Sequence, residues 1–221
     1  MPWLGYFDKI AKSDAFVFMD QGHYKESEFQ NRNKIRTDRG ALWLTVPVIS
    51  KCPGRQKISD VFIDHDIDWR KQHLESLRTY YGRAAYFKKY IGFFEDLYDR
   101  RWERLGKLNV LITRFILKEL GIDTPLYFES ELCTTATKAE CITELCLKMK
   151  ADKYLFGSGG RDYSEEEKFK QAGITLVYQK FEHPVYRQQY MRDKDHFLAH
   201  LSTVDLLFNV GPDSRKVLEL T

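Results

Sequence analysis

The sequence contains no apolar run that approaches the roughly 20 residues needed to span a bilayer. Cysteine is scarce, and Cys52, Cys133, Cys141 and Cys146 form no CxxC pair, which argues against a structural zinc site. The first residues lack both the basic region and the long apolar region of a signal peptide. These absences predict a cytoplasmic protein with reduced thiols, without membrane insertion and without a bound metal.

The sequence also lacks a strong excess of charge of either sign. Its 35 Lys and Arg residues against 32 Asp and Glu residues give a net charge of +3, which is too small to indicate a nucleic-acid partner. Apolar residues are abundant, because 43% of the 221 residues are hydrophobic and 14% are aromatic. That composition supports a core, and the length fits one compact domain or one domain with an insertion.

Strand and helix signals alternate at both ends of the chain. Short apolar runs predict strands at residues 15–19, 41–48, 58–63, 126–128, 154–156 and 174–178. The chain from Gln21 to Gly40 is polar and is predicted to be a loop. The β–α–β–α–β order near the C-terminus is typical of parallel crossover connections.

The middle of the chain has three consecutive helical patterns. The first runs from Trp69 to Tyr81, with Asp68 as its N-cap and Gly82 as its stop, and the others cover residues 84–102 and 108–120. We therefore predict an α/β fold with a mainly parallel, Rossmann-like sheet that is interrupted by a helical insertion. The predicted parts of this single domain are residues 1–67, 68–121 and 122–221.

A last helix is predicted from about Phe197 to Phe208. Within it, Asp205 stands among apolar neighbours, so its carboxylate is expected to have a partner. A structural hydrogen bond and a catalytic role both remain open for it.

The loop at residues 157–163 is the strongest candidate for a ligand site. It reads Gly-Ser-Gly-Gly-Arg-Asp-Tyr and connects a predicted strand to a helix that a Ser164–Glu167 capping box opens. Glycine N–H groups and a helix N-terminus favour a bound anion, and an arginine adds a bidentate donor. The loop has the spacing of neither a Walker A motif nor a Rossmann fingerprint, and a simple tight turn is the alternative.

Two further segments are candidates for chemistry. The polar stretch from Asp20 to Asn33 directly follows a buried strand and is rich in side chains that could recognise a sugar, although an ordinary solvated loop is the alternative. His183 follows a strand and precedes Pro184, so it could act as a general base, or be a structural histidine held by a neighbouring carbonyl. Because the carboxyl ends of parallel strands share one sheet edge, we expect the polar stretch and the glycine-rich loop to converge on one cleft.

Several motifs in order resemble the WbqC-like family of bacterial surface-polysaccharide gene clusters. The N-terminal ones are Pro-Trp-Leu-Gly-Tyr-Phe at 2–7, Val-Phe-Met-Asp at 17–20, Gln-Asn-Arg-Asn-Lys-Ile at 30–35, Leu-Thr-Val-Pro-Val at 44–48 and Trp69…His73. The C-terminal ones are the glycine-rich loop, Tyr-Gln at 178–179, His183-Pro184 with Tyr186, and Leu201 to Asn209. Family members usually carry a further strand ahead of the first motif; a sheet without it exposes an edge, so a homo-oligomer is also considered.

The resemblance implies a transferase that acts on a sugar or sugar nucleotide in O-antigen biosynthesis, with glycyl or aminoacyl transfer as one form. The implied small-molecule substrate is a sugar nucleotide or an activated amino acid, and no motif specifies a cofactor. Catalytic roles are assigned to His183 and Asp162. Substrate-binding roles are assigned to Asp20, Tyr24, Asn31, Arg32, Ser158, Gly159, Gly160, Arg161, Tyr163 and Tyr186. A nucleotidyltransferase-like enzyme and a non-catalytic carbohydrate-binding or scaffold protein are the alternatives.

Overall fold

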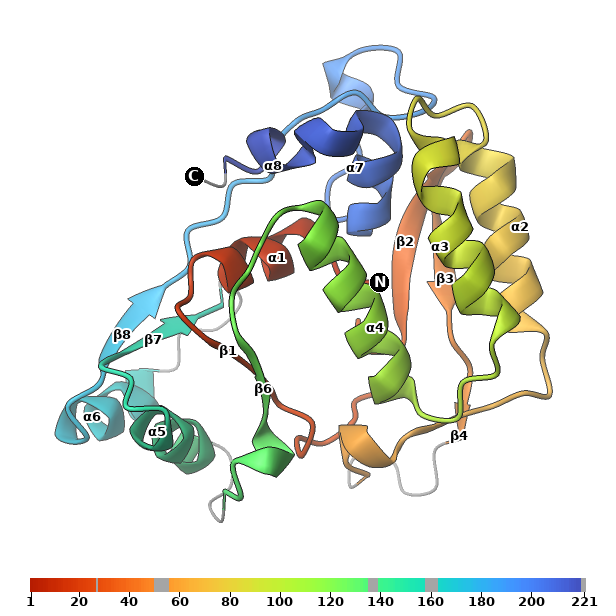
Figure 1. Ribbon diagram of the computed structural model, residues 1–221. Coiled ribbons are helices and arrows are strands. Elements are labelled where there is room, and N and C mark those ends of the chain that lie inside the picture. The colour runs from red at the N-terminus through yellow and green to blue at the C-terminus, as the bar shows by residue number, and fades with distance from the viewer. Residues whose placement is uncertain (27, 50–55, 135–138, 158–162, 220–221) are drawn as a thin grey trace.

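The computed structural model describes residues 1–26, 28–49, 56–134, 139–157 and 163–219 (Figure 1). Its helices are α1 (Leu4–Ala11), α2 (Trp69–Tyr81), α3 (Phe87–Asp99), α4 (Leu105–Glu119), α5 (Ala139–Lys148), α6 (Tyr163–Gln171), α7 (Thr203–Val210) and α8 (Ser214–Val217). Its strands are β1 (Phe16–Phe18), β2 (Arg32–Thr37), β3 (Gly40–Thr45), β4 (Val48–Ile49), β5 (Phe62–Ile63), β6 (Leu126–Phe128), β7 (Lys153–Phe156) and β8 (Thr175–Tyr178). The protein is therefore a mixed α/β structure.

The strands pair two by two, and two of the pairs are parallel. β1 pairs with β6, from which the stacked rings of Phe18 and Phe128 project with centroids 5.2 Å apart. β7 pairs with β8, and α6 is the crossover between them. These parallel pairs agree with the predicted alternation at the two ends of the chain, and β7, β8, α5 and α6 lie together at one end of the molecule (Figure 1).

The other two pairs are antiparallel, so the prediction of one mainly parallel sheet is wrong for the described part of the chain. β2 and β3 form a hairpin whose two-residue turn is Asp38-Arg39, and Gly40 follows it with a φ of 123° that favours glycine. β4 pairs with β5 over two residues in each strand. Polar residues that were expected to form a loop form β2 instead, because its inward-facing side chains find partners elsewhere in the molecule.

The main core collects side chains from the whole length of the chain. Phe94 of α3 packs against Phe115 of α4 and Phe208 of α7, with ring centroids 5.9 and 5.8 Å apart, and Tyr81 of α2 packs against Phe208. α2 and α3 lie side by side, and α4 lies between them and α1 (Figure 1). The structure thus does not show α2, α3 and α4 as a separate insertion, because they build the core with α1, β2, β3 and α7.

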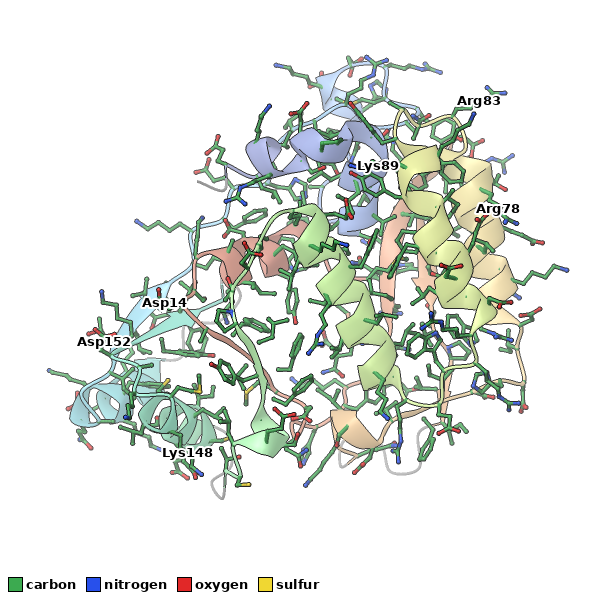
Figure 2. All side chains as sticks on the ribbon, in the orientation of Figure 1. Asp14, Arg78, Arg83, Lys89, Lys148 and Asp152 are labelled. Atoms are coloured by element: carbon green, nitrogen blue, oxygen red, sulfur yellow. The ribbon has the colours of Figure 1, made fainter. Side chains whose placement is uncertain are left out.

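A smaller cluster of Cys146, Phe169 and Ile174 holds α5 and α6 against β7 and β8. Lys148, at the end of α5, donates to the main-chain oxygens of Leu132 and Cys133, both at 2.8 Å (Figure 2). This side chain therefore ties the end of α5 to the chain that leaves β6.

The N-terminal segment connects the hairpin to the carboxyl end of β8. Asn33 of β2 donates through Nδ2 to the carbonyl of Met1 at 2.7 Å, and Trp3 forms an antiparallel bridge with Ser202. A few residues on, Gln179 donates through Nε2 to the Gly5 carbonyl at 2.8 Å and to the Asp8 carboxylate at 2.7 Å. The segment therefore positions residues from both ends of the chain around one region.

Candidate functional site

Asp20, at the end of β1, is engaged by the neighbouring strand connection. Its carboxylate accepts from the main-chain N–H of Ser130 at 3.0 Å and from the Ser130 hydroxyl at 2.6 Å. Both carboxylate oxygens thereby cap the turn after β6. The substrate-binding role of Asp20 stays a prediction. In the structure, its carboxylate stabilises the turn that follows β6.

Arg32 and Lys34 on β2 lie over the indole ring of Trp43 on β3. The Arg32 Cζ atom is 4.5 Å from the ring centroid and the Lys34 Nζ atom is 4.8 Å from it. Lys34 stands directly opposite Trp43 in the strand register, and the ring of Phe29 lies 5.8 Å from the indole. We call Phe29, Arg32, Lys34 and Trp43 the Trp43 face.

Tyr24 lies beside this face and is buried, with 2% of its surface exposed. Its hydroxyl has no hydrogen-bond partner among the described residues. Burial raises the pKa of Tyr24, the nearby Glu26 raises it further, and Arg32 opposes both effects. The structure thus brings the predicted residues Tyr24 and Arg32 into one electrostatic neighbourhood.

Asn31 lines a small cavity of about 20 Å³, which Arg32 also borders. Its Nδ2 donates to the Val46 carbonyl at 3.0 Å, while its Oδ1 has no partner among the described residues. His73 and Trp69 of α2 line the same cavity, and the Trp69 Nε1 is likewise without a partner in the described part of the chain. A space of this size holds roughly one water molecule, so it is too small for a sugar.

His73 is a neutral histidine in this cavity wall. One ring nitrogen lies 3.0 Å from the Thr45 carbonyl oxygen, which requires Nε2 to carry the hydrogen. Burial lowers the pKa of His73 to about 4, although the hydrogen bond to Thr45 works in the opposite direction. His73 is therefore uncharged at neutral pH and supports the packing of α2 against β3.

His183 lies in the extended segment after β8, and one of its ring nitrogens has no partner among the described residues. Its Nδ1 is 3.0 Å from the Pro184 carbonyl oxygen and must donate to it, so the neutral ring keeps a lone pair on Nε2. That Nε2 is buried and has no partner among the described residues, and burial lowers the pKa of His183. A neutral imidazole with a bare Nε2 can accept a proton from a substrate.

Aromatic rings form the surroundings of this imidazole, and we call them the His183 group. The ring centroids of Phe181, Phe197 and His200 lie 5.9, 5.4 and 5.5 Å from that of His183. Trp3 closes the group, because its ring centroid lies 5.3 Å from both Phe181 and His200.

Tyr186, another predicted substrate-binding residue, is buried and points into a polar network around Asp205. Asp205 is fully buried, and its carboxylate accepts from the hydroxyls of Tyr81 at 2.7 Å and Tyr186 at 2.8 Å and from the Gln188 amide at 3.0 Å. The prediction that Asp205 has a partner is confirmed. Arg36 donates to Gln188 at 2.8 Å and so extends the network to β2.

The Asp205 network and the His183 group share a wall. Phe197 packs on Tyr186 with ring centroids 5.3 Å apart and on His183 at 5.4 Å. Burial raises the pKa of Asp205, and the hydrogen bonds from the two tyrosines and Gln188 oppose that effect. The network therefore fixes the segment from which His183 projects.

The glycine-rich loop cannot be placed in the same way. Ser158, Gly159, Gly160, Arg161 and Asp162 lie outside the described residues, and Tyr163 is described only as the first residue of α6. The predicted convergence of this loop with Asn31 and Arg32 on one cleft therefore stays a prediction.

Sequence reasoning missed several residues that the structure brings together, which are Trp3, Phe29, Lys34, Trp43 and His200. The signal for Trp43 was the strand register, since Lys34 and Trp43 are equally far from the Asp38-Arg39 turn. That signal depends on recognising β2 as a strand.

Within the described residues, no three His, Cys, Asp or Glu side chains are grouped so that they could hold a metal ion. None of the helices among them is long and apolar enough to cross a membrane. The described cysteines, Cys133, Cys141 and Cys146, carry free thiols.

Comparisons with known proteins give the relatives of the chain. A family model described as the WbqC-like protein family matches residues 1–217. A protein of Mycobacterium tuberculosis with the name "Uncharacterized protein Rv1507c" is 34% identical over 215 residues, which cover 97% of this chain and 91% of that protein. No solved structure matches the chain.

Proposed function

The chain belongs to the WbqC-like protein family, as the order of its motifs indicated, and on this premise we propose that it is a transferase of surface-polysaccharide biosynthesis. The proposed substrate is a sugar or a sugar nucleotide, and glycyl or aminoacyl transfer is the proposed form of the reaction. We also propose a cytoplasmic location, on the argument from reduced thiols.

The observation that carries this proposal is the state of His183. Its Nδ1 hydrogen is fixed on the Pro184 carbonyl, which leaves Nε2 as an unprotonated acceptor. Its lowered pKa keeps the ring neutral at physiological pH, and a base must be unprotonated to act. In acyl transfer, Nε2 would take the proton from the amine or hydroxyl nucleophile as that group forms a bond to the acyl carbon. It would return the proton to the leaving group of the activated donor as the bond between that group and the acyl carbon breaks.

Further roles follow from the same reaction. Arg161 and the Gly159 and Gly160 amides are the proposed donors to the developing oxyanion, in the manner of an oxyanion hole. Asp162 is the alternative base, or the group that orients an ammonium substrate. Arg32, with its guanidinium on the Trp43 face, is the proposed contact for a phosphate of the substrate.

The test is replacement of His183 by alanine. We expect turnover to fall by roughly 10²–10⁴-fold, the usual range for general acid–base help, while ligand binding is kept. Thermal-shift screening across sugar nucleotides, nucleotides and activated amino acids first identifies the ligand, because a ligand at 100 times its Kd adds about 2.7 kcal/mol of stability.

His65→Ala is the matched control. His65 also places a ring nitrogen 3.0 Å from a main-chain oxygen, that of Trp102, but it lies outside the His183 group. Turnover should be unchanged in this variant. Normal turnover in His183→Ala would show that His183 is only a structural residue.

A non-catalytic carbohydrate-binding protein is the second candidate, and an open cleft of about 670 Å³ favours it. The cleft lies between the tip of the β2–β3 hairpin and α2, and Tyr80, Tyr190, Thr79, Asp38 and Arg39 are among its lining residues. Aromatic rings, hydroxyls and charged side chains of this kind recognise sugars. Glycan binding that Tyr190→Ala abolishes, in a protein without turnover, would support this candidate.

A further inference from the structure

The Trp43 face brings two positive charges together over one ring. Arg32 and Lys34 are two residues apart on the same face of β2, and their charged groups lie 4.5 and 4.8 Å from the Trp43 ring centroid. The indole attracts each cation, but the two cations repel each other. No ion pair to Lys34 occurs in the described part of the chain, and Glu26 acts electrostatically on Tyr24. An anion beside Lys34 would relieve this repulsion.

The same face leaves two aromatic rings open to solvent. Trp43 is 39% exposed and Phe29 is 56% exposed, and the two rings lie at 43° to each other. Exposed rings beside cationic side chains are the arrangement by which proteins hold nucleobases, since the base stacks while the cations hold the phosphates. A purely inorganic anion would leave the rings unused.

The buried Tyr24 hydroxyl is an independent observation that points to a ligand. It has no hydrogen-bond partner among the described residues, although a buried hydroxyl without one costs about 1–3 kcal/mol. Arg32 lowers the pKa of Tyr24 against the effect of burial, so the Arg32 charge acts on this hydroxyl. A phosphate oxygen held by Arg32 would lie near the Tyr24 hydroxyl and would accept the hydrogen of that hydroxyl.

We propose that the Trp43 face binds a nucleoside diphosphate, the activated end of a sugar nucleotide. Arg32 and Lys34 hold the two phosphates, the exposed rings of Phe29 and Trp43 pack on the base, and the Tyr24 hydroxyl donates to a phosphate oxygen. This inference rests on the proposed function for its choice of a sugar nucleotide, but it concerns binding and not transfer.

The experiment is calorimetric titration of the full chain with nucleoside diphosphates of the common bases, inorganic diphosphate and free nucleosides, at two salt concentrations. Lys34→Gln should weaken nucleoside diphosphate binding roughly tenfold and reduce its salt dependence, because one phosphate contact is lost. Trp43→Leu should weaken it roughly 5- to 100-fold, the range for loss of one stacking ring. Phe29→Leu is the second variant of this kind. Phe29 is more exposed than Trp43, so this variant should keep its fold and still report the loss of a stacking ring if Trp43→Leu unfolds the protein.

Two matched variants are the controls. Tyr127→Leu removes another exposed ring, on β6, and Lys153→Gln removes another exposed lysine, on β7. Neither should change binding by more than about twofold. The inference is overturned if no nucleoside diphosphate binds, or if all variants bind it equally well. It is also overturned if inorganic diphosphate binds as tightly, or if Trp43→Leu only breaks a dimer of the chain.

The failure of this inference can be told apart from failure of the proposed function. His183→Ala should bind nucleoside diphosphates with unchanged affinity, because His183 is not part of the Trp43 face. If binding depends on Lys34 and Trp43 but no donor supports turnover, this inference stands and the transferase proposal fails. If turnover depends on His183 while nucleoside diphosphates do not bind, the transferase proposal stands and this inference fails.

Discussion

Two buried polar clusters of this protein differ in how fully their side-chain atoms are hydrogen-bonded, although the Arg36 Nε at the edge of the first has no partner among the described residues. In the Asp205 network, both carboxylate oxygens accept hydrogen bonds, from Tyr81, Tyr186 and Gln188. In the cavity behind β3, the Asn31 Oδ1 and the Trp69 Nε1 have no partners within the described part of the chain. A buried polar group with partners stabilises a fold, whereas a buried group without one costs free energy and indicates a place for a ligand or water.

His183 belongs with the second kind of cluster. Its Nδ1 is used to fix the ring and its Nε2 is left over, so the residue combines a rigid position with an available lone pair. The difference teaches that the Asp205 network holds the segment in place, while the neighbouring His183 keeps one ring nitrogen that no described residue uses. Measurements of stability can break or sharpen this comparison.

The largest effect is expected for Asp205→Ala. The change leaves the buried hydroxyls of Tyr81 and Tyr186 without their acceptor and removes one acceptor of the Gln188 amide. It also removes the carboxylate that faces the Arg36 charge. Removal of one partner from such a buried charged network costs about 3–5 kcal/mol. The measurement is the free energy of unfolding in urea at neutral pH.

Asp213→Ala is the matched control for this loss. Asp213 pairs with Lys216 at 2.7 Å on the surface, where solvent screens the pair, and little change in stability is expected. A small loss in Asp205→Ala, comparable to that of the control, would contradict the structural role of the network.

The second effect concerns the cavity behind β3 and depends on pH. The unfolded chain binds a proton at His73 near pH 6.5, whereas the folded protein keeps His73 neutral down to a pKa of about 4. The unfolded state therefore holds more protons in this window, and stability falls as the pH is lowered from 6.5 to 4. The loss assigned to His73 is on the order of 3 kcal/mol.

His73→Gln isolates this contribution, because glutamine can still donate to the Thr45 carbonyl but does not titrate. Unfolding free energies of both proteins, measured from pH 7 to pH 4, should diverge as the pH is lowered, and the variant should give the flatter profile. Parallel profiles would show that His73 is accessible to protons in the folded state.

Local signals in the sequence predicted many of the elements. α2 begins and ends where expected, because Asp68 accepts from the Lys71 N–H as an N-cap and Gly82 follows its last residue. β2 was missed, because its polar residues are buried only by partners distant in sequence, such as Met1 for Asn33. The last helix begins at Thr203 and not near Phe197, because the Ser202 N–H is bonded to the Lys34 carbonyl and its side chain caps the helix.

The candidate site was likewise only partly predictable from local signals in the sequence. The isolated acid among apolar neighbours revealed that Asp205 needs a partner, but Tyr81 lies 124 positions away and no local pattern connects the two. The position of His183 between a strand and a proline was a local signal. Two other rings of the His183 group, Trp3 and His200, come from the two ends of the chain, so their placement depends on the tertiary fold.

The smallest of these effects concerns the wall of the His183 group. A Cβ atom at Gly5 would lie 2.3 Å from the nearest atom of the Trp3 ring, so Gly5→Ala must displace that ring. Overpacking of this kind costs about 1–3 kcal/mol, which exceeds the roughly 1 kcal/mol that alanine gains over glycine in a helix. Because Trp3 packs on His200 and Phe181, thermal unfolding and turnover should both report the change.

Gly92→Ala makes the opposite prediction and serves as the matched control. Gly92 lies in the middle of α3, and no atom lies within 4 Å of where its Cβ would be. Alanine there restricts the unfolded chain and meets no neighbour, so stability should rise by about 0.5–1 kcal/mol. Both variants replace a helical glycine, so a rise in both would mean that the Trp3 ring is free to move away. Trp3 would then not be a fixed wall of the His183 group, and the contrast between a rigid Asp205 network and a fixed set of rings around His183 would no longer hold.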